Sequence, residues 1–199
     1  MKFLWVNIVV SSVMLVIIGT LFYKHQQPVT SGIDEMEIYV MQTNVEINEN
    51  NQWQEIPIKN GKFRNDSLEI FVTNLKMPVL MLRIKETSCQ TCVFNELSQI
   101  KELKKKGIEC VLLTTYASLG MVKKILRMKG CSDVRFFNAS YDCLYDWYVE
   151  QLEMPYYFVL HPDKKASDFF VPDKSQPQLT ESYFKSITRL FPVNGIVIN

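Results

Sequence analysis

Two cysteines separated by two residues, Cys89 and Cys92, have the types and spacing that point most directly to chemistry. They follow an almost continuous apolar run (78–84), which is typical of a strand buried on both faces. Apolar residues then recur at helical spacing: Val93, Leu97, Ile100 and Leu103. A strand followed by a helix places Cys89 at a helix N-terminus, where unpaired backbone N–H groups stabilise a thiolate. The pattern predicts that Cys89 is the nucleophile and that Cys92 resolves the mixed disulfide.

Two other interpretations of the cysteine pair remain open. The pair could be inert and structural, or it could be half of a zinc site. A zinc site needs further cysteine or histidine ligands. The remaining candidates stand singly in the sequence: His25, Cys110, Cys131, Cys143 and His161. The sequence therefore favours a redox pair, with no metal and no cofactor expected.

The other cysteines and a group of aromatic residues are interpreted mainly as core. Cys110 lies in an apolar stretch and is expected to be buried as a small hydrophobic residue. Cys131 and Cys143 flank a short predicted strand, and a disulfide between them is possible in an oxidising compartment. Aromatic residues could line a substrate groove, although packing is the commoner role. They are Tyr141, Tyr145, Trp147, Tyr148, Tyr156 and Tyr157.

The composition suits one ordinary folded domain with an appendage. The chain has 199 residues, 47% hydrophobic residues and a formal net charge of +1. A dedicated nucleic-acid-binding protein normally carries a basic excess or a clustered basic face. No nucleic-acid partner is therefore expected.

The appendage is a predicted membrane anchor, residues 3–23. This segment contains no charged side chain and is long enough, at about 1.5 Å per residue, to cross the hydrocarbon core as a helix. Its end lacks the small residues of a signal-peptide cleavage site, so an uncleaved signal anchor is expected. We expect a single-pass protein of the bacterial cytoplasmic membrane, with its C-terminal domain on the periplasmic or extracytoplasmic side.

After the anchor (1–23), the sequence predicts three further segments. Residues 24–35 are interpreted as a tether. Residues 36–65 are predicted to be a β-rich extension, with a hairpin turn at Asn60-Gly61. Residues 66–199 form the main domain, in which strands alternate with helices. Strands are expected at 108–116, 134–137, 156–161 and 166–171, and helices at 119–126, at 141–152 and from Thr180 onward.

The sequence resembles the thioredoxin superfamily, and in particular its membrane-anchored members of the TlpA and ResA type. The resemblance covers roughly residues 66–190. It is carried by VLMLRIKETSCQTC, by ECVLLTTY and by LEMPYYFVLHPDKKASDFF. It implies a thioredoxin-like α/β fold, with a central mixed sheet flanked by helices.

The resemblance also implies a substrate-binding position. In that family the corresponding proline is cis and lies against the disulfide, so the Met154–Pro155 bond is expected to be cis and to face the two cysteines. The backbone of Met154 would then pair with an extended substrate segment, because the proline itself offers no N–H. A trans bond, or a Pro155 more than about 10 Å from both sulfurs, would refute this assignment and favour a non-catalytic binding module over an enzyme.

Several positions depart from the family pattern. Ser88 and Thr91 stand where tryptophan and proline are common, and Arg83 stands where thioredoxin itself has an acid. Glu86 or Glu96 could accept a proton, although an exposed carboxylate is the simpler interpretation of each. These departures leave the redox potential and direction open.

The resemblance implies a thiol-disulfide oxidoreductase that acts on protein disulfides outside the cytoplasm. Its partners would be protein thiols and disulfides together with an electron-donor redox protein. Two alternatives remain: a non-catalytic thioredoxin-like binding module, and a thiol peroxidase of the peroxiredoxin type. Peroxiredoxins typically have a threonine three residues before the reactive cysteine, and Glu86 occupies that position before Cys89.

Overall fold

The computed structural model describes residues 35–56, 66–140 and 143–191. The predicted anchor and tether and the Asn60-Gly61 hairpin lie outside these residues. Within the described part of the chain, no helix combines the length and the apolar character needed to cross a membrane.

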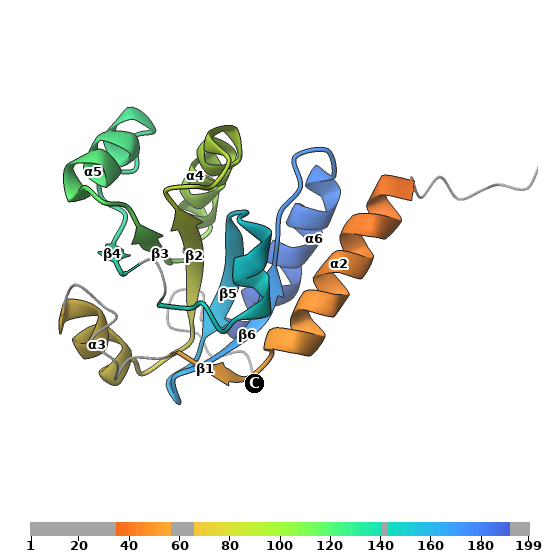
Figure 1. The fold of residues 1–199 in the computed structure, drawn as a ribbon, viewed down its shortest axis with the longest axis horizontal. Helices are drawn as coiled ribbons and strands as arrows, with labels where there is room; N and C mark the ends of the chain where they lie inside the picture. The colour runs from red at the N-terminus through yellow and green to blue at the C-terminus, as the bar shows by residue number, and fades with distance from the viewer. Residues whose placement is uncertain (1–34, 57–65, 141–142, 192–199) are drawn as a thin grey trace, which may run out of the picture. The chain divides into compact units, whose positions relative to one another are not determined.

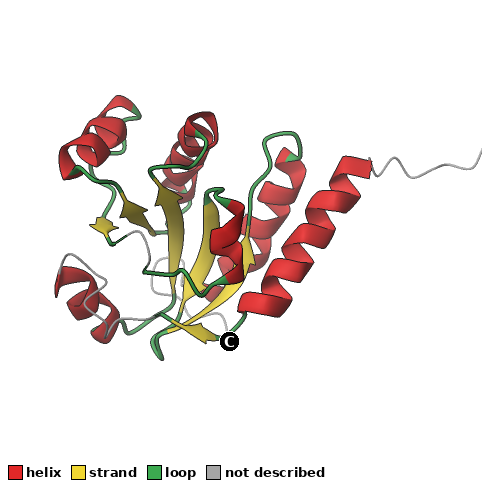
Figure 2. Ribbon diagram, viewed as in Figure 1, coloured by secondary structure: helices red, strands yellow, loops and turns green. Residues whose placement is uncertain are grey.

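The described residues form a six-stranded mixed sheet at the centre of the fold (Figures 1 and 2). The strands are β1 (Gln54–Glu55), β2 (Val79–Lys85), β3 (Cys110–Thr115), β4 (Phe136–Asn138), β5 (Tyr156–Leu160) and β6 (Lys165–Phe170). Their order across the sheet is β1-β6-β5-β2-β3-β4. β2, β3 and β4 are parallel neighbours, whereas β5 runs antiparallel to both β2 and β6.

Helices cover both faces of this sheet. They are α2 (Glu35–Asn51), α3 (Asp66–Thr73), α4 (Gln90–Lys105), α5 (Leu119–Met128) and α6 (Pro177–Ile187), with the short 3-10 helices η1 (Tyr148–Leu152) and η2 (Thr188–Leu190). Side chains of α4, α5 and α6 share one core cluster, and side chains of α3 and of the segment around Trp147 share the other. Alternate residues of β2 enter the two clusters: Met81 enters one, and Leu80 and Leu82 enter the other. The prediction of a strand buried on both faces is confirmed.

The predicted β-rich extension is wrong over most of its described length, because residues 35–51 form the helix α2. Its inward face mixes apolar Ile47 with three asparagines, Asn44, Asn48 and Asn51. An amphipathic helix is recognised by a regular apolar stripe, which these asparagines interrupt. Among the described residues of this extension, the short strand β1 is the part that agrees with the prediction.

Two of these asparagines form hydrogen bonds with backbone groups at the end of β6 and just after it. The Asn48 side chain donates to the Phe169 carbonyl (2.6 Å) and accepts from the Phe169 N–H (2.8 Å). Asn44 forms the same pair of bonds with Val171, at 3.2 and 2.7 Å. A free strand edge invites pairing with another chain, so these amides both anchor α2 and protect the edge.

We expect Asn48→Ala to lower the free energy of unfolding by about 1–3 kcal/mol, since it removes the partners of two backbone groups on β6. Urea denaturation measures this loss. Asn50→Ala is the matched control, because the exposed Asn50 amide donates to the Glu46 carbonyl of its own helix and to no other described residue. Equal effects of the two substitutions would contradict the role assigned to Asn48.

One helix was not expected, and two further expectations are corrected. Leu68 and Val72 are buried four residues apart in α3, while Ile70 between them is 61% exposed. The helix expected at 141–152 shortens to η1, because an i to i+3 bond, from the Glu150 N–H to the Trp147 carbonyl at 3.0 Å, forms a tighter turn. The last helix begins at Pro177 and not at the expected Thr180, since proline suits the first helical position.

Candidate functional site

Cys89 and Cys92 form a disulfide at the point where β2 passes into α4. Their Cα atoms lie 5.2 Å apart, within the usual range for a disulfide. A tight turn connects strand and helix, in which the Ser88 N–H donates to the Lys85 carbonyl at 3.0 Å. Cys89 is the N-cap residue of α4, and its Sγ accepts the Cys92 N–H at 3.3 Å.

This placement confirms the predicted setting of Cys89. The Cys89 sulfur already accepts a helix N-terminal amide, which is the type of contact that stabilises a thiolate. Cys89 is exposed, whereas Cys92 is half-buried and so less accessible. A partner thiol or disulfide therefore reaches Cys89 more readily.

A buried charged cluster lies on β2 before the disulfide. The Arg83 guanidinium, which is fully buried, donates to the Glu150 carboxylate from Nε at 2.7 Å and from Nη2 at 3.3 Å. The Tyr156 hydroxyl donates to the same carboxylate at 2.7 Å. The Lys85 ammonium donates to the Glu150 backbone carbonyl at 2.5 Å and lies 3.6 Å from the carboxylate. Although burial opposes ionisation of Arg83, the Glu150 carboxylate raises the pKa of the guanidinium, so Arg83 stays charged.

The two candidate proton acceptors, Glu86 and Glu96, differ in their exposure to solvent. Glu86 is exposed, as expected, and accepts the Ala117 N–H at 2.8 Å. Glu96 is only 7% exposed, so the prediction of an exposed carboxylate is wrong for this residue. It lies on the inward side of α4, where the Tyr157 hydroxyl donates to its carboxylate at 2.9 Å.

The predicted cis bond between Met154 and Pro155 is wrong, because every peptide bond between described residues is trans. The chain instead turns at Glu153, whose φ of 53° is left-handed, and then enters β5. Pairing of Arg83 with Tyr156 places Pro155 at the carboxyl end of β2, the end that leads to the disulfide. The half-buried Met154 forms no backbone hydrogen bond to another described residue. The predicted bond geometry is therefore wrong, and the pairing of the Met154 backbone with a substrate stays a prediction.

The remaining cysteines are buried parts of the core. Burial raises the pKa of the Cys110 thiol, in agreement with its interpretation as a small hydrophobic residue. Cys131 and Cys143 belong to core clusters on opposite faces of the sheet, so the suggested disulfide between them does not form. Of the aromatic residues, Trp147, Tyr156 and Tyr157 are buried as expected for packing, whereas Tyr145 is 73% exposed.

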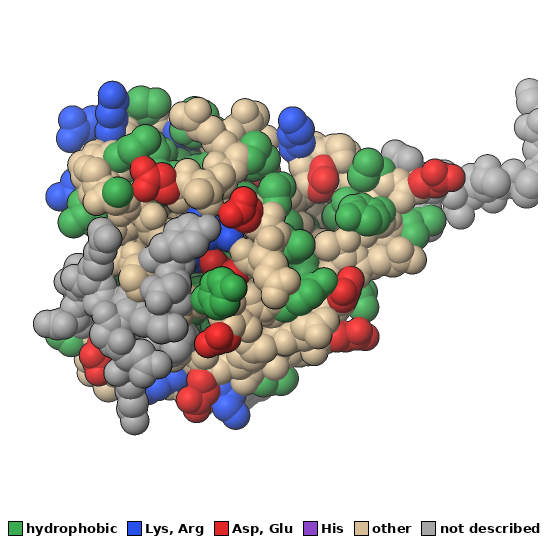
Figure 3. All heavy atoms as spheres, viewed as in Figure 1, with side chains coloured by type: hydrophobic (Ala, Val, Ile, Leu, Met, Phe, Trp, Pro, Cys, Tyr) green, Lys and Arg blue, Asp and Glu red, His purple; other side chains and the backbone are tan. Residues whose placement is uncertain are grey.

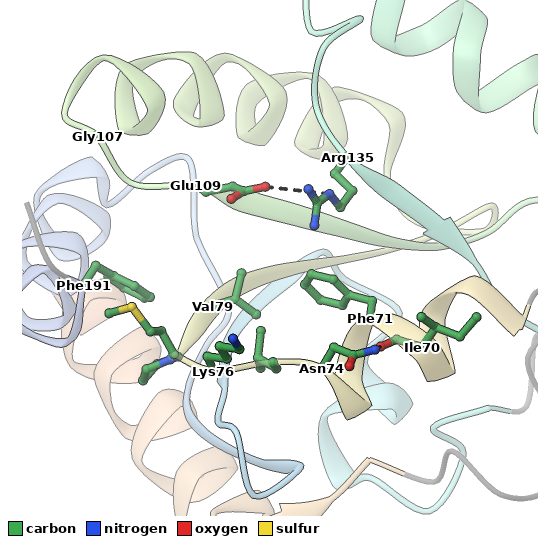
Figure 4. Close-up of a pocket in the computed structure, with 12 residues that line it drawn as sticks. Ile70, Phe71, Asn74, Lys76, Val79, Gly107, Glu109, Arg135 and Phe191 are labelled. Atoms are coloured by element: carbon green, nitrogen blue, oxygen red, sulfur yellow. Dashed lines mark hydrogen bonds and ion pairs between the residues drawn. The ribbon is translucent and has the colours of Figure 1, made fainter. Parts of the chain in front are cut away.

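A cavity of about 610 Å³ lies away from these residues (Figure 4). Val79 at the start of β2 and Gly107 before β3 line it, so it is at the opposite end of these strands from Cys89. Glu109 and Arg135 both line it and form an ion pair with each other at 3.8 Å on one of its sides. On the face shown in Figure 3, acidic and basic side chains are scattered among hydrophobic ones.

The order and direction of the elements around the disulfide identify the type of fold. β2, α4 and β3 form a parallel β-α-β unit, the β5–β6 hairpin lies antiparallel beside β2, and α6 returns to the sheet face that α4 covers. The chain has a thioredoxin-like α/β fold. Within this fold the Cys-x-x-Cys disulfide begins the helix that follows the central strand β2.

Several solved structures resemble the chain at low sequence identity. A secreted disulfide oxidoreductase of Mycobacterium tuberculosis, homologous to E. coli DsbE, is 14% identical, with a TM-score of 0.41 over 55% of this chain and 81% of that chain. A thiol:disulfide interchange protein from Bacteroides sp. is 14% identical, with a TM-score of 0.39 over 60% and 76%. The thioredoxin domain of a Bacteroides vulgatus thiol-disulfide oxidoreductase is 16% identical, with a TM-score of 0.39 over 58% and 83%. No protein-family model and no curated protein matches the chain.

Proposed function

We propose that the protein is a thiol-disulfide oxidoreductase that exchanges disulfides with other proteins through Cys89 and Cys92. The observation that carries this proposal is the disulfide at the N-terminus of α4, with Cys89 exposed and its sulfur bonded to a helix amide. A purely structural disulfide needs neither exposure of one sulfur nor stabilisation of its thiolate.

In the reductive direction, the Cys89 thiolate attacks one sulfur of a substrate disulfide and displaces the other substrate sulfur as a thiolate. A mixed disulfide between Cys89 and the substrate results. The Cys92 thiolate then attacks the Cys89 sulfur, the second substrate thiolate leaves, and the protein disulfide closes. The protein dithiol has lost two electrons and the substrate disulfide has gained them, so an electron-donor redox protein must restore the dithiol.

The second part of the proposal is that residues 3–23 anchor this domain in the bacterial cytoplasmic membrane, with residues 24–199 on the extracytoplasmic side. The uncharged N-terminal segment and the disulfide support it.

Reporter fusions placed after Asn199 test this orientation. We expect activity from a reporter that works only outside the cytoplasm, and none from a reporter that works only inside. The reverse pattern would contradict the proposed orientation while leaving the redox chemistry untouched.

One observation favours a second candidate function, a non-catalytic binding module. The Met154–Pro155 bond is trans, whereas the family resemblance implied a cis bond beside the disulfide. A module of this kind would keep the disulfide as a structural element and bind a partner without exchanging electrons.

Turnover assays separate the candidate functions. The full-length protein should reduce a disulfide substrate such as insulin in the presence of dithiothreitol faster than dithiothreitol alone, and should not consume hydrogen peroxide at a comparable rate. Peroxide turnover would instead indicate the thiol peroxidase. Turnover of neither substrate would favour the binding module.

A further inference from the structure

Lys85, the last residue of β2, contacts two separate parts of the candidate site. Its backbone N–H donates to the Ser88 hydroxyl at 3.2 Å, and its carbonyl accepts the Ser88 N–H at 3.0 Å. These two bonds close the turn that leads to Cys89. The Lys85 side chain instead donates to the Glu150 carbonyl of η1 at 2.5 Å. One residue therefore joins the turn before the disulfide to η1.

The bond between Lys85 and Glu150 is shielded from water. Lys85 is 2% exposed and Glu150 is 8% exposed. A hydrogen bond from a charged donor is stronger than one between neutral groups, and a buried group that loses its partner is costly. The position of η1 against the end of β2 therefore depends on this bond.

Lys85 and Arg83 hold Glu150 in different ways. The Arg83 guanidinium and the Tyr156 hydroxyl bond to the Glu150 carboxylate, whereas Lys85 donates its hydrogen bond to the Glu150 main chain. Rotation of the Glu150 side chain can absorb a change at the carboxylate. A shift of the main chain is instead passed on to the following residues, which turn at Glu153 (φ 53°) and enter β5. Lys85 thus fixes the course of the chain between η1 and β5.

This stretch, residues 150–155, lies where a protein that reacts with Cys89 would also touch it. Tyr156, the next residue, pairs with β2 at the end that leads to the disulfide. Gln151 and Glu153 are exposed. Even a transient redox complex buries up to about 1,200 Å² of surface, far more than one sulfur atom presents. A protein partner therefore meets residues 150–155 as well as Cys89, whereas a small disulfide needs only the exposed sulfur.

We propose that Lys85 is a positioning residue, which holds residues 150–155 beside the disulfide turn so that the site favours protein disulfides over small ones. This inference rests on the proposed function, and it assigns the residue that selects this class of substrate. Lys85 itself forms and breaks no bond to sulfur. It fixes the surface that a partner protein contacts while the partner's disulfide reacts with Cys89.

Two quantities, both measured with the full-length protein, test this assignment. The first is kcat/KM for the reduction of insulin, with dithiothreitol as the electron source. The second is the rate constant for the reaction of the prereduced protein with 5,5′-dithiobis(2-nitrobenzoate). Lys85→Met is close in length to the original side chain but removes its donor. The ratio of the first quantity to the second should fall about tenfold, through a higher KM for insulin, because the segment then holds the described position only part of the time.

Tyr156→Phe is the matched control, because it removes a buried hydrogen bond to the Glu150 carboxylate and leaves the Lys85 bond in place. It should leave the ratio unchanged, and a fall equal to that of Lys85→Met would show general destabilisation and overturn the assignment. Lys85→Arg should restore most of the ratio, since a guanidinium can donate to the same carbonyl. A cavity of about 280 Å³ that Lys85 lines leaves room for the larger group.

Hydrogen exchange of the Glu150 amide, which donates to the Trp147 carbonyl at 3.0 Å, follows η1 directly. In the unsubstituted protein this amide should exchange at least about 100-fold more slowly than in an unstructured chain, and Lys85→Met should speed its exchange about tenfold. Unprotected exchange in the unsubstituted protein, or an unchanged ratio in a folded Lys85→Met variant, would overturn the role of Lys85 while the proposed function would stand. Absence of insulin reduction by the unsubstituted protein would instead contradict the proposed function.

Discussion

Cys92→Ser is expected to accumulate covalent complexes with substrate proteins through Cys89, whereas Cys89→Ser is expected to form none. Cys89 is exposed at the N-terminus of α4 and attacks first, so its mixed disulfide persists when the resolving thiol is absent. Either substitution should lower turnover at least about 1000-fold, a scale seen when a catalytic nucleophile is removed. Non-reducing gel electrophoresis after acid quenching measures the trapped complexes.

The same geometry predicts which thiol reacts in the reduced protein. The helix amide that bonds to the Cys89 sulfur should lower the pKa of that thiol below the free value of about 8.5. Alkylation rates of Cys92→Ser and Cys89→Ser, measured against pH, give the two values separately. Equal and slow alkylation of both variants would contradict the nucleophilic role of Cys89 and favour the binding module.

Arg83→Leu is expected to lower the free energy of unfolding by about 3–5 kcal/mol, because it leaves the Glu150 carboxylate buried without its main partner. Lys85 remains 3.6 Å from that carboxylate and compensates only in part. Denaturant unfolding measures this loss.

A double-mutant cycle provides the control for this prediction. Arg83→Leu combined with Glu150→Leu removes both buried charges, and it should recover much of the stability lost in the single variants. A loss below about 1 kcal/mol in Arg83→Leu would be the size expected for an exposed ion pair, and would contradict a buried cluster.

The sequence predicts the elements around the disulfide well because their signals are local. The apolar run of β2 is continuous, the stripe that follows Cys92 has helical spacing, and β3 is again apolar throughout. These three elements fix the position of Cys89 at the N-terminus of a helix without any knowledge of distant contacts.

The elements that were mispredicted depend on contacts between distant parts of the chain. The sequence does not predict that Asn48 and Asn44 face inward, because their partners, Phe169 and Val171, lie more than a hundred residues away. Glu150 was likewise not singled out. A buried arginine requires an acidic partner, so Arg83 in a predicted buried strand indicates that such a partner exists. The sequence alone does not identify this partner as Glu150. Tyr157 pairs with Glu96 in the same way, across 61 residues.

The most direct test of the account is an equilibrium titration of the Cys89–Cys92 pair in glutathione or dithiothreitol buffers, with the two states separated by thiol alkylation. We expect a single reversible two-electron transition between about −270 mV, as in thioredoxin, and about −120 mV, as in DsbA. A value near the first would indicate a reductase, and a value near the second an oxidant. A pair that is still fully oxidised below about −300 mV, as structural disulfides are, would contradict the account.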